Sequence, residues 1–109
     1  MAKIILANAF SINMLTQNTT LNFQQITADE AKTLIIDNNG GDSIIGHPDT
    51  ARVVGNILDI PVACNRVSWA WPKDENVILL VAQLTGPRLP EGATTLPEGA
   101  VIKWWKVTI

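Results

Sequence analysis

Hydrophobic residues recur along the chain with two different periods, and these periods divide it into predicted strands and helices. Short runs that are rich in Val, Ile and Trp, or that alternate between apolar and polar residues, are typical of β-strands. Such runs occupy Lys3–Ala7, Thr20–Ile26, Arg66–Trp71, Val77–Gln83 and Val101–Ile109. The isoleucine-rich run Lys3–Ala7 is almost entirely apolar, which favours a central strand buried on both faces.

Two other segments have apolar residues three and four positions apart, as in an amphipathic helix. The first begins at Thr27, which has the capping-box spacing to Glu30, and ends at the Asn38–Gly41 stop after about ten residues. The second begins at Pro48, a residue suited to the first helical turn. Its apolar stripe is Ala51, Val54, Ile57 and Leu58. Asp42–Ile45 lies between the helices as a short segment broken by Gly46-His47-Pro48.

The order of these elements is strand, strand, helix, helix, then three strands, which indicates an α+β fold. We expect a single domain over residues 1–109, with a mixed five-stranded β-sheet and two main helices. A chain of 109 residues can enclose one hydrophobic core but not two. Its apolar fraction of 47% and charged fraction of 17% are those of a folded protein rather than a disordered one.

Charge and cysteine content exclude several classes of protein. The net charge of -2 argues against a DNA-binding protein that relies on a basic face, although a small anionic ligand remains possible. Cys64 is the only cysteine, so an internal disulfide and a thiolate metal cluster are excluded, and a reducing cytoplasm fits best. No apolar run approaches the roughly 20 residues that span a bilayer, so no membrane partner is expected.

His47 is the first candidate for chemistry, because histidine is the side chain that most readily gives or takes a proton near neutral pH. It lies just before the second predicted helix, where backbone N–H groups point outward and favour an anion such as a phosphodiester. The ordinary alternative is a loop residue near a helix start, and a single histidine on its own favours that alternative.

Polar residues in two loops are the other candidates. Arg88 and Glu91 lie in a Gly/Pro-rich segment, where a guanidinium suits a phosphate and a carboxylate suits a ribose hydroxyl. A solvated surface pair is the commoner meaning of that spacing. Asn8, Ser11 and Asn13 follow the first strand, and ligands often bind beyond strand ends. Turn and cap chemistry is the alternative for these three residues.

The four tryptophans and the scarcity of metal ligands refine this picture. Trp104 and Trp105 are adjacent in a predicted strand and must point to opposite faces of the sheet. Base stacking is one use for such residues, and core packing or a dimer contact is another. With one histidine, one cysteine and no carboxylate pair at ligand spacing, neither a metal nor another cofactor is expected. Walker-type phosphate loops and hydrolase nucleophile elbows are absent.

Four segments carry a resemblance to a known family. They are Leu6-Ala7-Asn8-Ala9-Phe10-Ser11-Ile12-Asn13-Met14-Leu15, Ile45-Gly46-His47 before a helix, Asn65-Arg66-Val67, and Arg88-Leu89-Pro90-Glu91-Gly92. In this order they resemble the anti-CRISPR ring nuclease family, first known as small uncharacterised proteins of archaeal viruses and also found in phages and bacteria. The run from Asn8 to Met14 is the most specific of the four segments.

The resemblance implies a homodimer that encloses cyclic tetra-adenylate across its two-fold axis and cuts it into linear di-adenylates with cyclic phosphate ends. It implies that His47 protonates the departing ribose oxygen while the adjacent 2′ hydroxyl attacks, without a metal. Arg88 would hold the scissile phosphate and Glu91 would assist by positioning. Asn8 and Ser11 would orient the sugar, and Asn13 and Gly46 would complete the ligand-binding set.

One departure from the family pattern and two rival functions remain. Leu84-Thr85-Gly86-Pro87 separates the strand from Arg88, so a lid over the ligand should differ in length, and the segment after Gly92 is expected to be a loop. A binding protein that only sequesters the cyclic nucleotide would use the same pocket. A structural or regulatory module would instead bind a protein partner through its tryptophan-rich strands.

Overall fold

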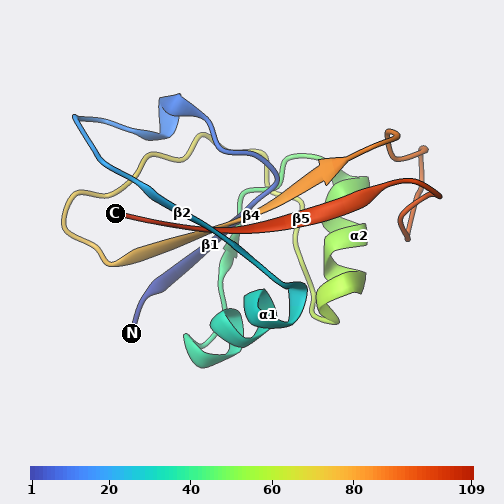
Figure 1. Ribbon diagram of the computed structural model, residues 1–109, viewed down its shortest axis with the longest axis horizontal. Helices are drawn as coiled ribbons and strands as arrows, with labels where there is room; N and C mark the ends of the chain where they lie inside the picture. The colour runs from blue at the N-terminus through green and yellow to red at the C-terminus, as the bar shows by residue number, and fades with distance from the viewer.

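A mixed five-stranded sheet runs through the computed structural model, which describes residues 1–109 (Figure 1). The strands are β1 Lys3–Ala7, β2 Asn22–Ile26, β3 Asp42–Ser43, β4 Val77–Thr85 and β5 Val101–Thr108. They follow the order β2-β5-β4-β1-β3 across the sheet. The helices are α1 Ala28–Asp37, α2 Pro48–Leu58 and the short 3-10 helix η1 Ile12–Met14. The predicted α+β class, with a mixed five-stranded sheet and two main helices, is confirmed.

β1 is a central strand, as its apolar sequence predicts. It pairs in parallel with β4 on one side, where Lys3 is opposite Val77, and in parallel with β3 on the other, where Leu6 is opposite Ser43. Its residues Ile4 to Ala7 are all buried, because both faces of the sheet are covered at this position. The carboxyl ends of β1, β3 and β4 therefore lie at the same edge of the sheet.

β4 and β5 form a long antiparallel pair, and β2 completes that side of the sheet. β4 continues to Thr85, two residues beyond the predicted end, so half of the Leu84-to-Pro87 insertion lengthens the strand. The loop that follows is closed at its base by Gly86, where a Cβ atom would lie 2.4 Å from the carbonyl oxygen of Gly99. Only glycine fits there, and its φ of +93° also favours glycine.

The prediction of a strand over Arg66–Trp71 is wrong, and the fifth strand is Asp42–Ser43 instead. β3 and β4 occupy both sides of β1, so this segment has no place beside the central strand. Its tryptophans are used for packing: Trp71 is buried, and Trp69 packs against the same cluster. The N–H of Trp71 donates to the carbonyl of Met14, which fixes the segment to η1 rather than to the sheet.

Both helices begin where the sequence predicts. Thr27 and Glu30 form a complete capping box at the start of α1, with hydrogen bonds of 3.0 and 3.1 Å. α2 begins at Pro48 with His47 as its N-cap residue and ends at Leu58, followed by the C-cap residue Asp59 in a left-handed backbone conformation. None of the helices is long and apolar enough to cross a membrane.

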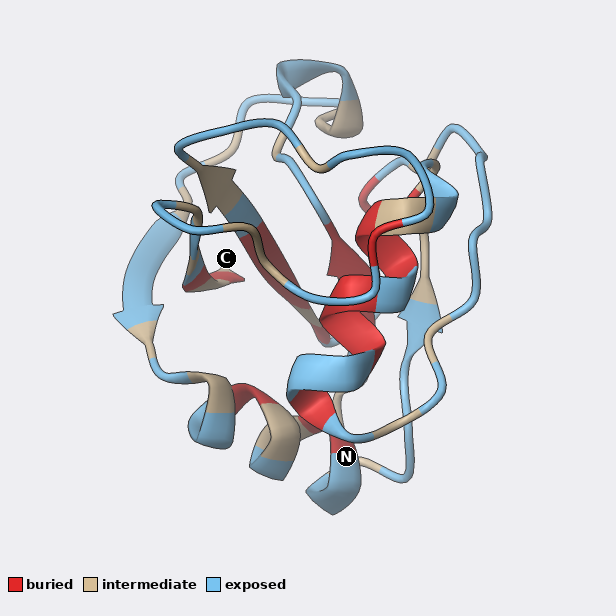
Figure 2. Ribbon diagram, turned by 90° about the vertical axis from the view of Figure 1, so that its right-hand side faces the viewer, coloured by how far each residue is buried: buried red, intermediate tan, exposed pale blue.

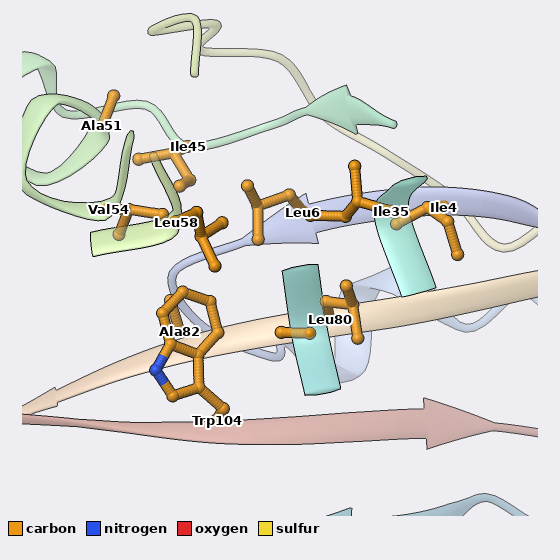
Figure 3. Close-up of a cluster of buried hydrophobic side chains, with 11 residues drawn as sticks. Ile4, Leu6, Ile35, Ile45, Ala51, Val54, Leu58, Leu80, Ala82 and Trp104 are labelled. Carbon is orange, nitrogen blue, oxygen red and sulfur yellow. The ribbon is translucent and has the colours of Figure 1, made fainter. Parts of the chain in front are cut away.

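The two faces of the sheet are covered by different kinds of structure. On one face, α1 and α2 bury their apolar sides against alternate residues of the strands, with Trp104 of β5 pointing toward the side chains of α2 (Figure 3). A fully buried Leu58 or Val54 stabilises the fold by about 1.5 to 3 kcal/mol. On the other face, Trp71, the loop residue Phe10 and Met14 of η1 cover the remaining strand residues. Trp105 belongs to that second face, so the two adjacent tryptophans do point in opposite directions.

Candidate functional site at the carboxyl ends of the parallel strands

The sheet topology brings the predicted site residues to one edge of the molecule from three separate segments. Asn8, Ser11 and Asn13 follow β1, Gly46 and His47 follow β3, and Arg88 and Glu91 follow β4. Because these three strands are parallel, their carboxyl ends share an edge, which is where ligands commonly bind in such sheets.

His47 has a side chain that the fold does not use. As the N-cap residue of α2, its backbone carbonyl accepts a hydrogen bond of 3.0 Å from the N–H of Ala51. Its imidazole is exposed and makes no capping hydrogen bond. The first N–H groups of α2 thus have no partner from their own cap residue, and they add a partial positive charge beside the imidazole.

The loop between β4 and β5 lies against α2. In Figure 2 this loop passes in front of the helix. Asp49 Oδ1 accepts from the N–H of Gly92 at 3.2 Å, and Asn56 Nδ2 donates to the carbonyl of Thr94 at 2.6 Å. Glu91 directly precedes Gly92, and Asp49 is two residues from His47. The structure therefore brings the Arg88–Glu91 segment to the helix that His47 begins.

Arg88 and Glu91 are both exposed, and neither makes a hydrogen bond or an ion pair within the chain. The ordinary alternative for this spacing, a solvated pair joining the two side chains, is therefore not formed. Both ends are free to meet a ligand. Arg52 differs in this respect, since it contacts Asp49 at 3.5 Å.

Ser11 is used for local structure. Its hydroxyl accepts from the N–H of Asn13 at 3.3 Å, which caps the 3-10 helix η1. This is the cap chemistry that the sequence left open as an alternative, although the exposed hydroxyl can still donate a hydrogen bond to a ligand. The amide side chain of Asn13 is exposed as well.

Asn8 lies at the rim of a hollow of about 490 Å³ on the face of the sheet that the two α-helices do not cover. The lining residues are Asn8, Ala9, Phe10, Phe23, Val81, Gln83 and Trp105. Phe10 and Phe23 contact each other edge to face, with ring centroids 5.5 Å apart, and Trp105 Nε1 donates to Gln83 Oε1 at 2.9 Å. The hollow therefore combines aromatic surface with two carboxamide groups. No hydrogen bond joins it to His47, whose helix packs on the opposite face.

Arg66 is a further cationic residue near this site. Sequence analysis gave it no role. A Cβ atom on Gly46 would lie 3.0 Å from Arg66 Cγ, so the stem of Arg66 lies against the backbone just before His47. Hydrogen bonds from the N–H of Asn65 to the Ile45 carbonyl and from its side chain to the Ser43 carbonyl hold the segment there. The absent side chain of Gly46 leaves room for Arg66. The signal available in the sequence was the Asn65-Arg66 pair itself.

The charges on α2, on the 86–99 loop and on the segment that packs beside Gly46 are mixed rather than uniformly basic. Arg52, Arg66 and Arg88 supply three guanidinium groups, while Asp49 and Glu91 supply two carboxylates. The side chain of Asp49 is only 14% exposed and is offset by Arg52. No group of three or more His, Cys, Asp or Glu side chains is arranged to hold a metal ion. The local excess of cations suits a small anion more than an extended polyanion.

The fold and the site define an α+β domain with its candidate site on loops at the carboxyl ends of parallel strands. Within this class the chain belongs to the STIV B116-like family, whose model matches residues 4–103. It is similar to the solved structure of B116 of Sulfolobus turreted icosahedral virus, with a TM-score of 0.77 and 24% identity over 99% of this chain and 100% of that one. No curated protein matches the chain. Similarity to an archaeal-virus family is thus confirmed for family and fold.

Proposed function

We propose that this protein is a metal-independent ring nuclease that cleaves cyclic tetra-adenylate into linear di-adenylates with 2′,3′-cyclic phosphate ends, thereby ending type III CRISPR signalling. The observation that carries the proposal is the free imidazole of His47 at the start of α2, beside a loop that bears the unpaired Arg88 and Glu91. The motif resemblance supplies the substrate, and the membership of a virus-derived family supports it.

The proposed reaction is an internal transesterification of the RNA backbone. A ribose 2′ oxygen forms a bond to the adjacent phosphorus and loses its proton to water, while the bond from phosphorus to the 5′ oxygen breaks. His47, protonated, donates its proton to that departing oxygen, a role that general acids perform with about a hundredfold to ten-thousandfold effect. Arg88 binds the phosphate and offsets the charge that develops on it, with Glu91 positioning the ligand.

A homodimer fits the proposed substrate. A ring of four adenylates has a two-fold axis, and two copies of the chain related by such an axis present identical surfaces to its two halves. Two His47 side chains then provide one acid for each of the two bonds that must break to give two di-adenylates. We place this dimer in the cytoplasm, where the signalling ring would be made.

The hollow around Asn8 suits an adenine base. Carboxamides such as those of Asn8 and Gln83 pair well with the edge of adenine, and aromatic rings such as Trp105 stack on bases. Ser11 and Asn13 lie in the same loop and would bind the ribose. Because this hollow and His47 lie on opposite faces of one chain, we propose that each ring contacts the two groups from different copies.

The test is to incubate purified protein with labelled cyclic tetra-adenylate in EDTA, beside the variant His47→Ala, and to separate the products. We expect linear di-adenylate from the natural protein and a loss of about a hundredfold or more in the variant. The variant should still bind the ring and keep its melting temperature, because His47 makes no side-chain capping bond.

An intact ring with the natural protein would overturn the enzyme proposal. Retention of that intact ring, measured by gel filtration or by a rise in melting temperature, would then indicate a protein that only sequesters the nucleotide. If the ring is neither cut nor retained, a protein-interaction module is the remaining function.

A further inference from the structure

Three polar side chains on one face of α2 contact three consecutive residues of the loop between β4 and β5. Asp49, Arg52 and Asn56 are spaced three and four positions apart, so they form one stripe along the helix. Their partners are the backbone groups of Gly92, Ala93 and Thr94, at 3.2, 3.5 and 2.6 Å respectively. The stripe and the loop segment thus run alongside each other.

The loop is shaped to receive these contacts. Gly92 has a φ of +78°, a conformation that glycine adopts without cost, and its N–H donates to Asp49. Ala93 is buried at 9% exposure although the residues around it are exposed. Asn56 is exposed on α2, and asparagine has a lower helix propensity than alanine. Its structural contribution is therefore the 2.6 Å hydrogen bond to Thr94 rather than the stability of α2.

We propose that Asp49, Arg52 and Asn56 form a latch that positions the loop 86–99 over the start of α2. The latch fixes the loop segment that directly follows Arg88 and Glu91 to the helix that His47 begins. Its few, partly exposed bonds allow the loop to open when a ligand enters or leaves. The three side chains are positioning residues and need not touch the ligand. The positioning role rests on the proposed ring nuclease activity, while the attachment of the loop does not.

The attachment is tested by hydrogen exchange of the free protein, without any nucleotide. In Asn56→Ala and Asp49→Ala we expect the backbone amides of residues 91–95 to exchange about tenfold faster, because each variant removes one of the bonds. The amides of α2 should keep their rates, since alanine is compatible with the helix. Asp49→Asn retains a carbonyl oxygen for the Gly92 N–H and should restore most of the protection. Thr33→Ala, an exposed position on α1, is the matched control.

The positioning role is tested by single-turnover cleavage of cyclic tetra-adenylate. We expect Asn56→Ala and Asp49→Ala to cleave about tenfold more slowly than the natural protein at saturating enzyme, with Asp49→Asn close to natural and Thr33→Ala unchanged. Product release, followed by fluorescent di-adenylate, should be faster in the two latch variants. A merely structural role would lower the melting temperature without separating these two rates.

Unchanged exchange of residues 91–95 in both alanine variants would overturn the latch. Faster exchange with an unchanged single-turnover rate would overturn its positioning role. If the natural protein leaves the ring intact, the proposed function fails together with the positioning role, and the exchange measurement still decides whether these side chains hold the loop.

Discussion

The two main helices begin in opposite ways. At the start of α1, Thr27 and Glu30 satisfy each other's backbone groups in a closed capping box. At the start of α2, the N-cap residue His47 makes no side-chain bond to the helix, and the imidazole is exposed. A helix start whose N–H groups are satisfied by its own capping side chains contributes to stability alone. One that is left open keeps donors and a titratable group free, which is what a site for an anionic ligand requires.

The largest expected effect comes from making the second helix start resemble the first. In His47→Ser, the serine hydroxyl can accept an N–H of the first turn and stabilise the protein by about 0.5 to 1 kcal/mol. Cleavage of cyclic tetra-adenylate should fall by about a hundredfold or more, because the general acid is gone. Thermal unfolding and product analysis on the same sample measure both changes. Full activity in this variant would show that the open start has no chemical purpose.

Arg88→Ala should have the next largest effect, on cleavage only. A guanidinium bound to a phosphate is worth about tenfold to a hundredfold, and Arg88→Lys should recover part of it because the charge returns without the forked geometry. Stability should not change, since Arg88 has no bond within the chain. Single-turnover rates check this, with Lys73→Ala as a control for the loss of one exposed positive charge elsewhere. An equal loss in that control would point to general charge rather than a placed arginine.

Thr27→Ala should have the smallest effect, and on stability alone. Loss of the cap should cost about 1 kcal/mol and lower the melting temperature by about 4 °C. Cleavage at 25 °C should equal that of the natural protein, because α1 carries no site residue. Calorimetry beside a rate measurement tests this. A drop in rate comparable with that of His47→Ser would remove the distinction between the two helix starts.

Local sequence signals predicted most of the fold. The capping box at Thr27, the proline at the start of α2 and the apolar run of β1 each specify an element through contacts within a few residues. The strand prediction for Arg66–Trp71 failed because Val and Trp side chains are also favoured where they pack against a core without pairing in a sheet. The strand Asp42–Ser43 was not predicted because two residues are too few to show a hydrophobic period.

The candidate site was predicted only in part. Its segments were found because chain order places them after parallel strands and because their motifs resemble a family. The contacts that join them were not predictable. Asp49 meets Gly92, and Arg66 meets Gly46, across long stretches of sequence, and the partners are backbone atoms that leave no trace in residue identity. For Ser11 the sequence allowed both ligand binding and helix capping, and the structure shows the capping hydrogen bond to Asn13.

The parallel pairing of β1 also has a consequence for how the protein is made. The partner of Lys3 in β4 is Val77, so β1 leaves the ribosome long before the strand that completes its ladder. Pairing between such distant segments closes a large loop and is intrinsically slow. We therefore expect the nascent chain to carry its most apolar strand half-paired until β4 emerges, and the three segments of the site to assemble only in the last stage of folding.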